Sequence, residues 1–374
     1  MYPFIIFSIV ALSVIWISNA GTHGPVISVY FLAVILFAII STGLKRTIIL
    51  SILFSDIIIL FFLEKNFPSL FFSYENNNIR FFDLTTTYLF TLIIVYFLIY
   101  LLIKSYRTER DYSMSQNDKI NRQSRKIIDS LNYASYIQNA LLPSKNYMNI
   151  ILPEHFVCYM PKDIVSGDFY WIKKINGKVV VVAADCTGHG IPGAFMSVLG
   201  ISLLNELVHR NEVLDSKLAL ENLRRETINV LTQNEKYELS DGMDMAFCIF
   251  DFQLMTLQYA GANNSIYLIR DKELIEYKAT RNPIGSYLVE SPFKNHNINL
   301  KKGDVIYLFT DGFVDQFGGE NGKKFRIKRF RRLLLEIYNR PMTEQKETIL
   351  RSFNSWTHNE YEQVDDILII GIRV

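Results

Sequence analysis

Several acidic residues in the C-terminal two thirds of the chain lie at the ends of apolar runs. Each of them either follows or opens such a run: Asp168, Asp185, Asp311, Asp365 and Asp366. Rigid strands aim strand-end carboxylates at one point, and neighbouring glycines let backbone carbonyls and water approach closely. Carboxylates without Cys or His partners suit hard cations, Mg²⁺ or Mn²⁺, rather than zinc. One Asp-Gly after a strand is typical of a turn, so the repetition favours a metal site without naming a reaction.

The elements that must position these acids lie between Pro143 and Val374, where short β-branched and aromatic runs alternate with longer helical patterns. We predict strands at 155–160, 167–174, 178–185, 245–251, 255–260, 265–270, 304–310 and 366–373. We predict helices at 192–210, 216–233, 325–338 and 343–357. The closely spaced strands between 245 and 270 are typical of an antiparallel meander. The pattern therefore indicates an α+β layer architecture rather than a βαβ repeat.

Several motifs give this segment a resemblance to a known family. The matching stretches are YIQNALLP (136–143), PKDIVSGDFYW (161–171), AADCTGHGIPGAFMS (183–197), DGMDMAFC (241–248), YAGANNSIYLIR (259–270), GDVIYLFTDGFVDQFGG (303–319) and EQVDDILIIGIRV (362–374). From about residue 130 to 374 the chain resembles the SpoIIE-like branch of the PPM phosphatases, which are relatives of protein phosphatase 2C. The resemblance implies an αββα sandwich, with two sheets between helical layers and a metal centre at one edge.

The resemblance also implies a reaction and a set of ligands. The reaction is hydrolysis of phosphoserine or phosphothreonine on a protein, by a hydroxide that two Mn²⁺ or Mg²⁺ ions activate. The implied ligands are Asp185 as the bridging carboxylate, the backbone carbonyl of Cys186, Asp168 through water, Asp311, and one of Asp365 and Asp366, of which the family pattern favours Asp365.

Three further residues of the motifs need interpretation. His189, in the glycine loop after Asp185, is either the acid that protonates the leaving oxygen or a residue that shapes the loop. Asp241 and Asp244 lie inside a family motif. For these two acids we favour turn formation and capping at the start of a strand.

Charge is distributed very unevenly along the chain. The first 103 residues hold four basic and four acidic side chains, out of 39 Lys+Arg and 37 Asp+Glu in the whole chain. The mean hydropathy of +0.14 therefore averages an almost charge-free segment with a soluble one. The net charge of +2 is too small to indicate nucleic-acid binding. The three widely spaced cysteines suit a reducing compartment and cannot form a disulfide framework.

The segment 1–103 predicts a four-helix transmembrane module. Apolar runs lie at about 3–18, 26–42, 47–63 and 84–103, with a mixed-charge loop at 64–83. A span needs roughly 20 apolar residues. Lys45, Arg46 and the basic residues after 103 predict, by the positive-inside rule, a multi-pass protein of the inner (cytoplasmic) membrane with both termini in the cytoplasm. Asp56 lies in the third run, where we expect it to face the bundle interior and hydrogen-bond a Ser or Thr.

The segment 104–142 predicts a helical connector with a coiled-coil seam. Its apolar residues recur at steps of seven, four and three: Ile120, Ile127, Leu131, Ala134, Ile137 and Leu141. The helix ends before Pro143, which cannot continue it. The seam fits a helix packed on the downstream domain or a parallel homodimer helix that carries a signal, and the two are compatible.

These features together predict three parts, 1–103, 104–142 and 143–374, in a membrane-anchored phosphatase with its catalytic domain in the cytoplasm. The implied partners are membrane lipid and a phosphorylated regulatory protein, by family analogy a STAS-domain anti-sigma-factor antagonist. The alternative is a non-catalytic receptor-scaffold with a phosphatase-like binding domain. A sensor kinase is disfavoured, because the connector contains no His and no Gly-rich nucleotide loop precedes a Lys.

Overall fold

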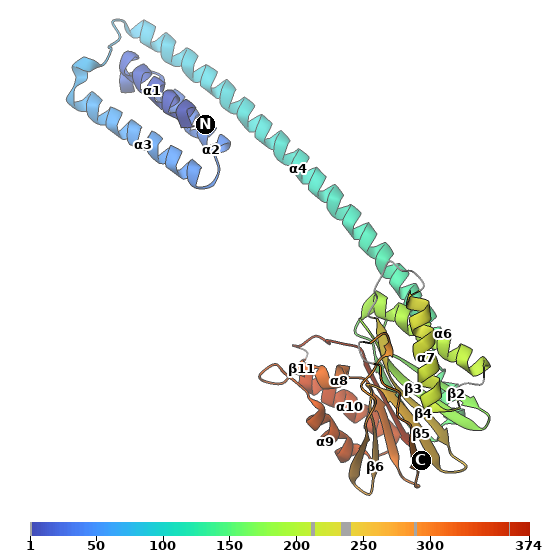
Figure 1. Cartoon of the computed structure of the whole chain (residues 1–374). Helices are drawn as coiled ribbons and strands as arrows, with labels where there is room; N and C mark the ends of the chain where they lie inside the picture. The colour runs from blue at the N-terminus through green and yellow to red at the C-terminus, as the bar shows by residue number, and fades with distance from the viewer. Residues whose placement is uncertain (1, 211–213, 233–240, 288–289, 359) are drawn as a thin grey trace. The chain divides into compact units, whose positions relative to one another are not determined.

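The computed structural model describes residues 2–210, 214–232, 241–287, 290–358 and 360–374. The chain divides into two compact units, Met1–Arg122 and Gln123–Val374. Each unit has its own buried apolar clusters, so each is described by itself (Figure 1).

The first unit is helical. Its elements are α1 (Tyr2–Ser18), α2 (Val26–Ile40), α3 (Gly43–Asn66) and the N-terminal part of α4 (Asn77–Leu141), with 3₁₀ turns at Gly21–His23 and Pro68–Leu70. The four apolar runs all fall on these helices. The prediction of a loop over 64–83 is wrong at both ends, because α3 continues to Asn66 and α4 already begins at Asn77. The side chain of Asn76 accepts a hydrogen bond from the Asn78 N–H at 2.8 Å, so the Asn-rich stretch caps a helix.

Helix length and composition bear on the membrane prediction. Among the described residues, three helices are long and apolar enough to cross a membrane, namely α3, α4 and α6 (Gly190–His209). α6 belongs to the second unit, where its buried residues pack in a core cluster with a sheet. α1 and α2 are shorter apolar helices. The four-span module therefore stays a prediction, with α3 and α4 as its strongest members.

The interior of the first unit contains paired polar groups. Asp56 on α3 accepts hydrogen bonds from the hydroxyl of Ser13 at 3.0 Å and from that of Tyr30 at 2.7 Å. Glu64, near the end of α3, accepts one from Trp16 Nε1 at 3.0 Å. Polar groups in an apolar interior are stable only when they are paired. The expectation that Asp56 faces the bundle interior and bonds a Ser is confirmed.

The second unit, in its described part, contains two antiparallel sheets. The first has the order β1-β13-β10-β6-β7 and consists of β1 (Glu154–Met160), β6 (Ile266–Arg270), β7 (Glu273–Tyr277), β10 (Val305–Phe309) and β13 (Ile367–Arg373). The second has the order β2-β3-β4-β5-β9, with β8 also paired to β4. It consists of β2 (Phe169–Ile175), β3 (Lys178–Cys186), β4 (Gly242–Asp251), β5 (Thr256–Ala262), β8 (Ile284–Gly285) and β9 (His296–Asn299). A short ribbon pairs β11 (Phe317–Gly318) with β12 (Lys323–Lys324).

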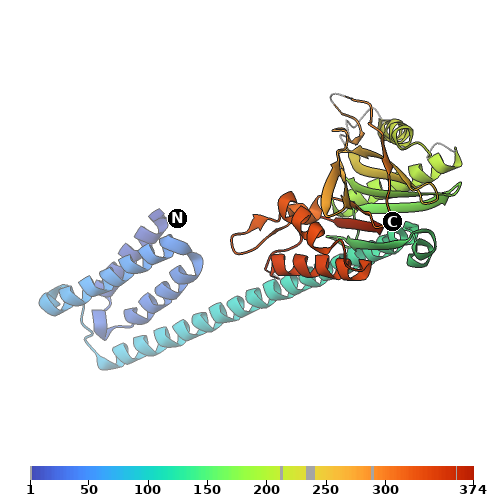
Figure 2. The same cartoon turned by 90° about the horizontal axis from the view of Figure 1, so that it is seen from below.

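Helices cover both outer faces of the stacked sheets. They are α6, α7 (Ser216–Thr232), α8 (Gly312–Asp315), α9 (Ile327–Ile337) and α10 (Met342–Thr357). The short helix α5 (Lys145–Ile151) instead packs its buried Met148 into the layer between the sheets. Figures 1 and 2 show α6 and α7 on one side of the sheets and α9 and α10 on the other. The expected αββα sandwich is therefore confirmed for this unit.

Side-chain alternation along the strands builds the apolar layers of this sandwich. β3 turns Val180 and Val182 toward α6 and α7, and it turns Val179 and Val181 toward the other sheet. Successive side chains of a strand point to opposite faces, so a strand covered on both sides reads as a continuous apolar run. This explains the uninterrupted run before Asp185.

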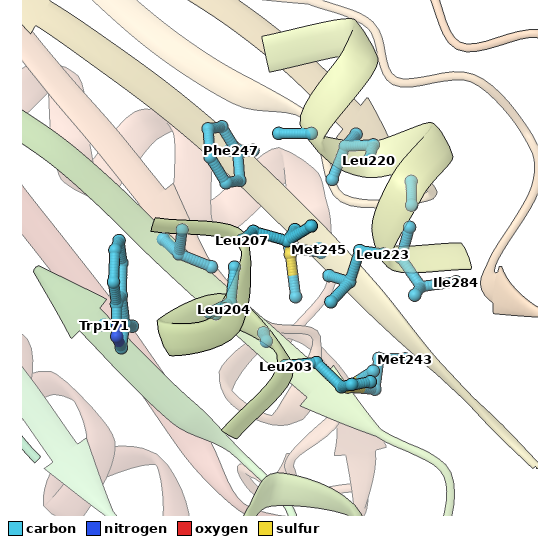
Figure 3. Close-up of a cluster of buried hydrophobic side chains, with 14 of the residues drawn as sticks. Trp171, Leu203, Leu204, Leu207, Leu220, Leu223, Met243, Met245, Phe247 and Ile284 are labelled. Atoms are coloured by element: carbon cyan, nitrogen blue, oxygen red, sulfur yellow. The ribbon is translucent and has the colours of Figure 1, made fainter. Parts of the chain in front are cut away.

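One layer lies between a sheet and its two helices. Figure 3 shows Leu204 and Leu207 of α6 and Leu220 and Leu223 of α7 near Phe247 of β4. All five side chains are buried. Burying a Leu or Phe side chain contributes roughly 1.5–3 kcal/mol, so this layer holds α6 and the loop before it firmly on the sheet.

The predicted elements of the second unit are confirmed within a few residues at each end. The last residue of the predicted helix 216–233 lies outside the described residues. The sequence did not predict α5, α8 or the strands β7, β8, β9, β11 and β12. Most of these are four residues long or shorter, and β7 is a largely exposed edge strand with charged residues, which gives it a weak apolar pattern.

Candidate metal centre and active site

Strand alternation delivers several acids to one edge of the space between the sheets. Asp185 continues the series Val181 and Ala183, whose side chains lie between the sheets. In β4, Asp244 points to the same face as Ala246, whose side chain also lies between the sheets. The strand register places Asp244 opposite Asp185. Because the side-chain period of a strand is two residues, both carboxylates reach the inter-sheet edge.

A cleft of ≈ 220 Å³ opens at this edge. It is lined by Asp185, Cys186, Thr187, Gly188, His189, Asp244, Asp311 and Asp365. Asp311 follows β10 and Asp365 precedes β13, so these two acids come from the first sheet. Asp185 and Asp244 come from the second sheet. The cleft therefore gathers four carboxylates that are far apart in the sequence.

The neighbouring acids Asp365 and Asp366 have different environments. Asp365 lines the cleft, and its carboxylate accepts a hydrogen bond from the Asp366 N–H at 2.9 Å. Asp366 is buried, and its two oxygens accept bonds from the backbone N–H groups of Lys162 and Gly167, both at 2.7 Å. The geometry favours Asp365 as the acid that faces a ligand, whereas Asp366 holds the segment before Asp168.

Asp168 does not line the cleft. Its side chain is 1% exposed and accepts a hydrogen bond from Thr310 Oγ1 at 2.7 Å. Thr310 accepts in turn from the Leu368 N–H at 3.0 Å. This chain of bonds ties Asp168 to the residue that precedes Asp311. The expectation that Asp168 acts through water stays a prediction.

Glycines let two loops of the site touch. A Cβ atom on Gly167 would lie 2.6 Å from the carbonyl oxygen of Gly188, and one on Gly193 would lie 2.2 Å from the same oxygen. No other residue type fits at either position without a backbone shift. These contacts hold the loop before Asp168 against the loop after Asp185.

His189 lies on the cleft wall at the N-terminus of α6. Its Nδ1 atom is 2.9 Å from the Asp163 carboxylate, and about half of each side chain is exposed. A carboxylate that bonds one ring nitrogen fixes the orientation of the ring. The pair gives the cleft a proton donor or acceptor in addition to its carboxylates.

The crowding of acids shifts their protonation. Burial, followed by repulsion from Asp311 and Asp365, raises the pKa of Asp185 to about 8. Burial, followed by repulsion from Asp315, raises the pKa of Asp311 to about 6, and the ammonium of Lys324 opposes this rise. Carboxylates that raise each other's pKa require a compensating positive charge before all of them can ionise.

The same pattern extends to two further acids, Asp168 beside the cleft and Asp244 on its wall. Burial and then repulsion from Asp185 raise the pKa of Asp168 well above its usual value, against the hydrogen bond from Thr310. Burial also raises the pKa of Asp244, against a hydrogen bond from Asn263. The whole cluster is therefore poised to bind cations.

The donor set suits hydrated cations rather than a closed protein cage. In the described part of the chain, no three His, Cys, Asp or Glu side chains are arranged to hold one ion directly. Mg²⁺ keeps several water ligands and needs only one or two carboxylates. The four carboxylates of the cleft, with no Cys thiolate or His pair among them, fit this chemistry.

Two acids near the cleft have positions that the sequence did not predict. Asp244 lies within β4, lines the cleft and accepts a bond from Asn263 Nδ2 at 2.8 Å, so its interpretation as a strand-start cap is wrong. Its alternation with buried residues of β4 is the signal that marks it. Asp163 carries no sequence signal beyond its place in a motif. Asp241, just before β4, does not line the cleft.

The chain matches a known protein family over the residues that form this fold and cleft. The family model described as Stage II sporulation protein E (SpoIIE) matches residues 175–374, which is more than half of the chain. The chain belongs to the SpoIIE family. The matched range includes all four cleft carboxylates, and the resemblance read from the motifs is confirmed.

Two relatives give this SpoIIE-family chain its context. Phosphoserine phosphatase RsbU of Bacillus subtilis is 29% identical over 170 residues, which are 44% of this chain and 47% of RsbU. The chain thus matches about half the length of this curated relative. The solved SiaA-PP2C domain of Pseudomonas aeruginosa is 32% identical with a TM-score of 0.62, over 67% of this chain and 98% of that structure. The second unit is a PP2C-type domain, similar over its whole length to the SiaA-PP2C domain.

Proposed function

We propose that this SpoIIE-family protein hydrolyses phosphoserine or phosphothreonine on a regulatory protein, using two Mg²⁺ or Mn²⁺ ions. The observation that carries the proposal is the convergence of Asp185, Asp311 and Asp365 from both sheets in one cleft. Membership of the SpoIIE family and similarity to a phosphoserine phosphatase support it.

The proposed ligands are Asp185 between the two ions, Asp311, Asp365 and the backbone carbonyl of Cys186, with Asp168 acting through water. When bound, the ions supply an activated water as nucleophile and neutralise the phosphoryl oxygens. The role of the protein is to hold several ionised carboxylates together at the ends of rigid strands. Asp366 is a positioning residue in this scheme, because its carboxylate holds the Lys162–Gly167 segment.

His189 is the proposed proton donor for the leaving oxygen. A departing Ser or Thr alkoxide is strongly basic, so a positioned acid accelerates its release. The place of His189 on the cleft wall and its contact with Asp163 support this role. Asp163 orients the ring through its contact with Nδ1.

The proposal includes anchoring of the chain in the inner membrane by the four apolar helices, with the phosphatase domain in the cytoplasm. The length and composition of α3 and α4 support anchoring. Lys45, Arg46 and Lys104 support the orientation. The cysteines Cys158, Cys186 and Cys248 are free and buried, which suits a reducing compartment.

The proposed substrate is a phosphorylated regulatory protein in partner-switching signalling, of the STAS-domain anti-sigma-factor antagonist type. This choice rests on family analogy and on the similarity to RsbU. It is independent of the metal chemistry, because any phosphoserine or phosphothreonine that reaches the cleft presents the same phosphoryl group.

Phosphate release by the full chain in detergent micelles tests the proposal. With Mn²⁺ and a phosphoserine peptide, we expect Asp185→Asn to lower kcat by about 100-fold or more, because the carboxylate between the ions is lost. Asp271→Asn, at an exposed turn between β6 and β7, is the matched control and keeps full activity. Release that survives chelation or Asp185→Asn contradicts the metal mechanism. A receptor-scaffold would bind the peptide and release no phosphate.

A further inference from the structure

A dense run of positive charge follows the active-site edge and continues into α9. We name it the basic ridge, and it consists of Lys323, Lys324, Arg326, Lys328, Arg329, Arg331 and Arg332. The ten residues 323–332 contain no acid. The apolar residues Phe325 and Phe330 between them are buried in the core. The charged side chains are therefore left on the outer side of the domain.

Only part of the charge of the basic ridge is neutralised. Its ion pairs are Lys324 with Asp315 (2.7 Å), Arg331 with Glu276 (2.8 Å) and Arg332 with Glu336 (3.5 Å). The Arg329 guanidinium lies over the Trp356 ring at 4.3 Å. Lys323, Arg326 and Lys328 are exposed, and no described carboxylate lies within ion-pair distance of them. The ridge therefore presents an excess of positive charge to solvent.

The basic ridge lies beside the catalytic cleft. α8 starts directly after Asp311, and Lys324 pairs with Asp315 at the end of α8. The Arg326 N–H donates to the Val314 carbonyl at 2.8 Å, which joins the start of α9 to α8. Figure 1 shows α8, α9 and β11 grouped together. A protein whose phosphorylated residue enters the cleft thus passes close to these side chains.

The backbone at Arg326 is unusual for a residue with a side chain. Its φ is 71° and its ψ is 148°, a conformation that glycine adopts far more readily. The Arg326 side chain is exposed. An exposed arginine in this backbone conformation costs conformational free energy and gains no burial in the core. This favours a role for its positive charge.

We propose that the basic ridge is a docking surface for an acidic face of the phosphorylated substrate protein. The inference rests on the proposed phosphatase function and adds the chemistry of the substrate surface. A phosphorylated side chain carries nearly two negative charges. A positive surface beside the cleft attracts an acidic partner and steers it into position. An anionic membrane is the other partner of matching charge, and the place of the ridge beside the cleft favours the substrate.

The test compares three substrates of the full chain in detergent micelles with Mn²⁺. They are p-nitrophenyl phosphate, a phosphoserine peptide with acidic flanks and the same peptide with neutral flanks. The ridge variant combines Lys323→Glu with Lys328→Glu. The control combines Lys301→Glu with Lys302→Glu, which changes the net charge equally at the end of β10 opposite Asp311. Fluorescence anisotropy of the labelled acidic peptide measures binding without turnover.

We expect the ridge variant to lose about tenfold in kcat/KM for the acidic peptide, mainly through KM. The other two substrates and the control variant change less than about twofold, and added salt removes the acidic preference of the unmodified chain. Equal losses on all three substrates, or an equal loss in the control, overturn the proposal. No turnover of any of the three substrates by the unmodified chain refutes the phosphatase function instead, and anisotropy then still decides the docking.

Lipid as the partner gives a different result. The full chain is placed in nanodiscs of neutral phosphatidylcholine or anionic phosphatidylglycerol, and acetylation of the ridge lysines is followed by mass spectrometry. Protection of Lys323 and Lys328 by the acidic phosphopeptide in both nanodiscs supports the proposal. Protection by phosphatidylglycerol alone, with no effect of the peptide, overturns it.

Discussion

Single residues in the cleft concentrate negative charge that bound cations are needed to offset. Asp185 and Asp311 share one edge of the sandwich with Asp244 and Asp365. Asp185, Asp244 and Asp365 are half-buried, whereas Asp311 is exposed at the mouth of the cleft. Burial and mutual repulsion raise the pKa of Asp185 to about 8 and that of Asp311 to about 6. A site that resists ionisation when empty favours cations strongly once its acids ionise, so metal binding, pH and stability are linked.

The metal-free protein should become less stable as pH rises. An unfolded Asp loses its proton near pH 4, whereas folded Asp185 and Asp311 keep theirs to higher pH. Unfolding therefore releases protons between about pH 4 and 8, and Asp185 alone lowers the free energy of unfolding by up to about 1.4 kcal/mol per pH unit in this window. The exposed Asp311 adds a smaller decrease below about pH 6. Thermal unfolding of the full chain with a chelator, followed by tryptophan fluorescence from pH 5 to 8, measures this slope. Asp185→Asn should flatten it, and Mn²⁺ should restore stability at pH 8; equal slopes in both proteins count against the predicted pKa shifts.

Two substrates with different leaving groups test whether His189 is the proton donor. p-Nitrophenolate leaves without protonation, whereas the alkoxide of phosphoserine needs a proton. We expect His189→Gln to lower kcat about 100-fold on a phosphoserine peptide and less than about threefold on p-nitrophenyl phosphate. Asp163→Asn should show the same selectivity with a smaller loss, because it only misorients the ring. Equal losses on the two substrates assign His189 to loop shaping.

At the scale of elements, local patterns predicted most of the fold. The continuous apolar run of β3 and the Asp-Gly after β10 are local signals, and both acids that follow them line the cleft. The position of Asp244 opposite Asp185 depends on the pairing of β3 with β4, which lie more than fifty residues apart. Asp366 is held away from the cleft by backbone N–H groups about two hundred residues earlier in the chain, whereas Asp365 lines the cleft. Alternation along β4 marks Asp244 as facing between the sheets, but neither long-range partner can be read from the local sequence.

The end of α4 is tied to the loop that precedes Asp168. Gln138 is 4% exposed, its amide donates to the Ser166 carbonyl at 2.6 Å and to Ser197 Oγ at 2.8 Å, and it accepts from the Ser166 N–H at 3.0 Å. Ser197 lies on α6, which begins next to His189. One side chain therefore joins the connector helix to the loop before Asp168 and to α6.

Gln138→Ala should loosen this part of the site. The buried partners left without bonds cost about 1–3 kcal/mol, so we expect lower thermal stability and a higher Mn²⁺ concentration for half-maximal activity. Asn139→Ala is the control, because Asn139 is exposed and bonds only Ser135, one turn earlier on the same helix. Activity titrated with Mn²⁺ and thermal unfolding of the full chain measure the two effects. A variant that loses stability while its Mn²⁺ dependence is unchanged shows that the amide does not influence the metal site.

On the scale of the whole molecule, the connector seam can pack on the downstream domain or pair with the seam of a second chain. Ile120, Ile127, Ile137 and Leu141 are 59%, 59%, 44% and 41% exposed. Exposure of this size argues against a seam packed on the downstream domain, and it leaves apolar surface for a second chain. A parallel homodimer would bury this surface in knobs-into-holes contacts. The proposed membrane module on each chain would raise the local concentration for such pairing.

Charge placed on the seam should therefore separate the two chains. We expect Ile127→Glu to raise the dimer dissociation constant of the full chain in micelles at least about tenfold, because a carboxylate at a seam position must be desolvated in the dimer. Ile128→Glu is the matched control, since Ile128 is also exposed, at 46%, but lies off the seam. Sedimentation equilibrium or energy transfer between labelled chains measures the constant. A chain that is monomeric at every concentration, or equal weakening by the two variants, would assign the seam's apolar residues to another contact and leave Gln138 as the link between connector and catalytic domain.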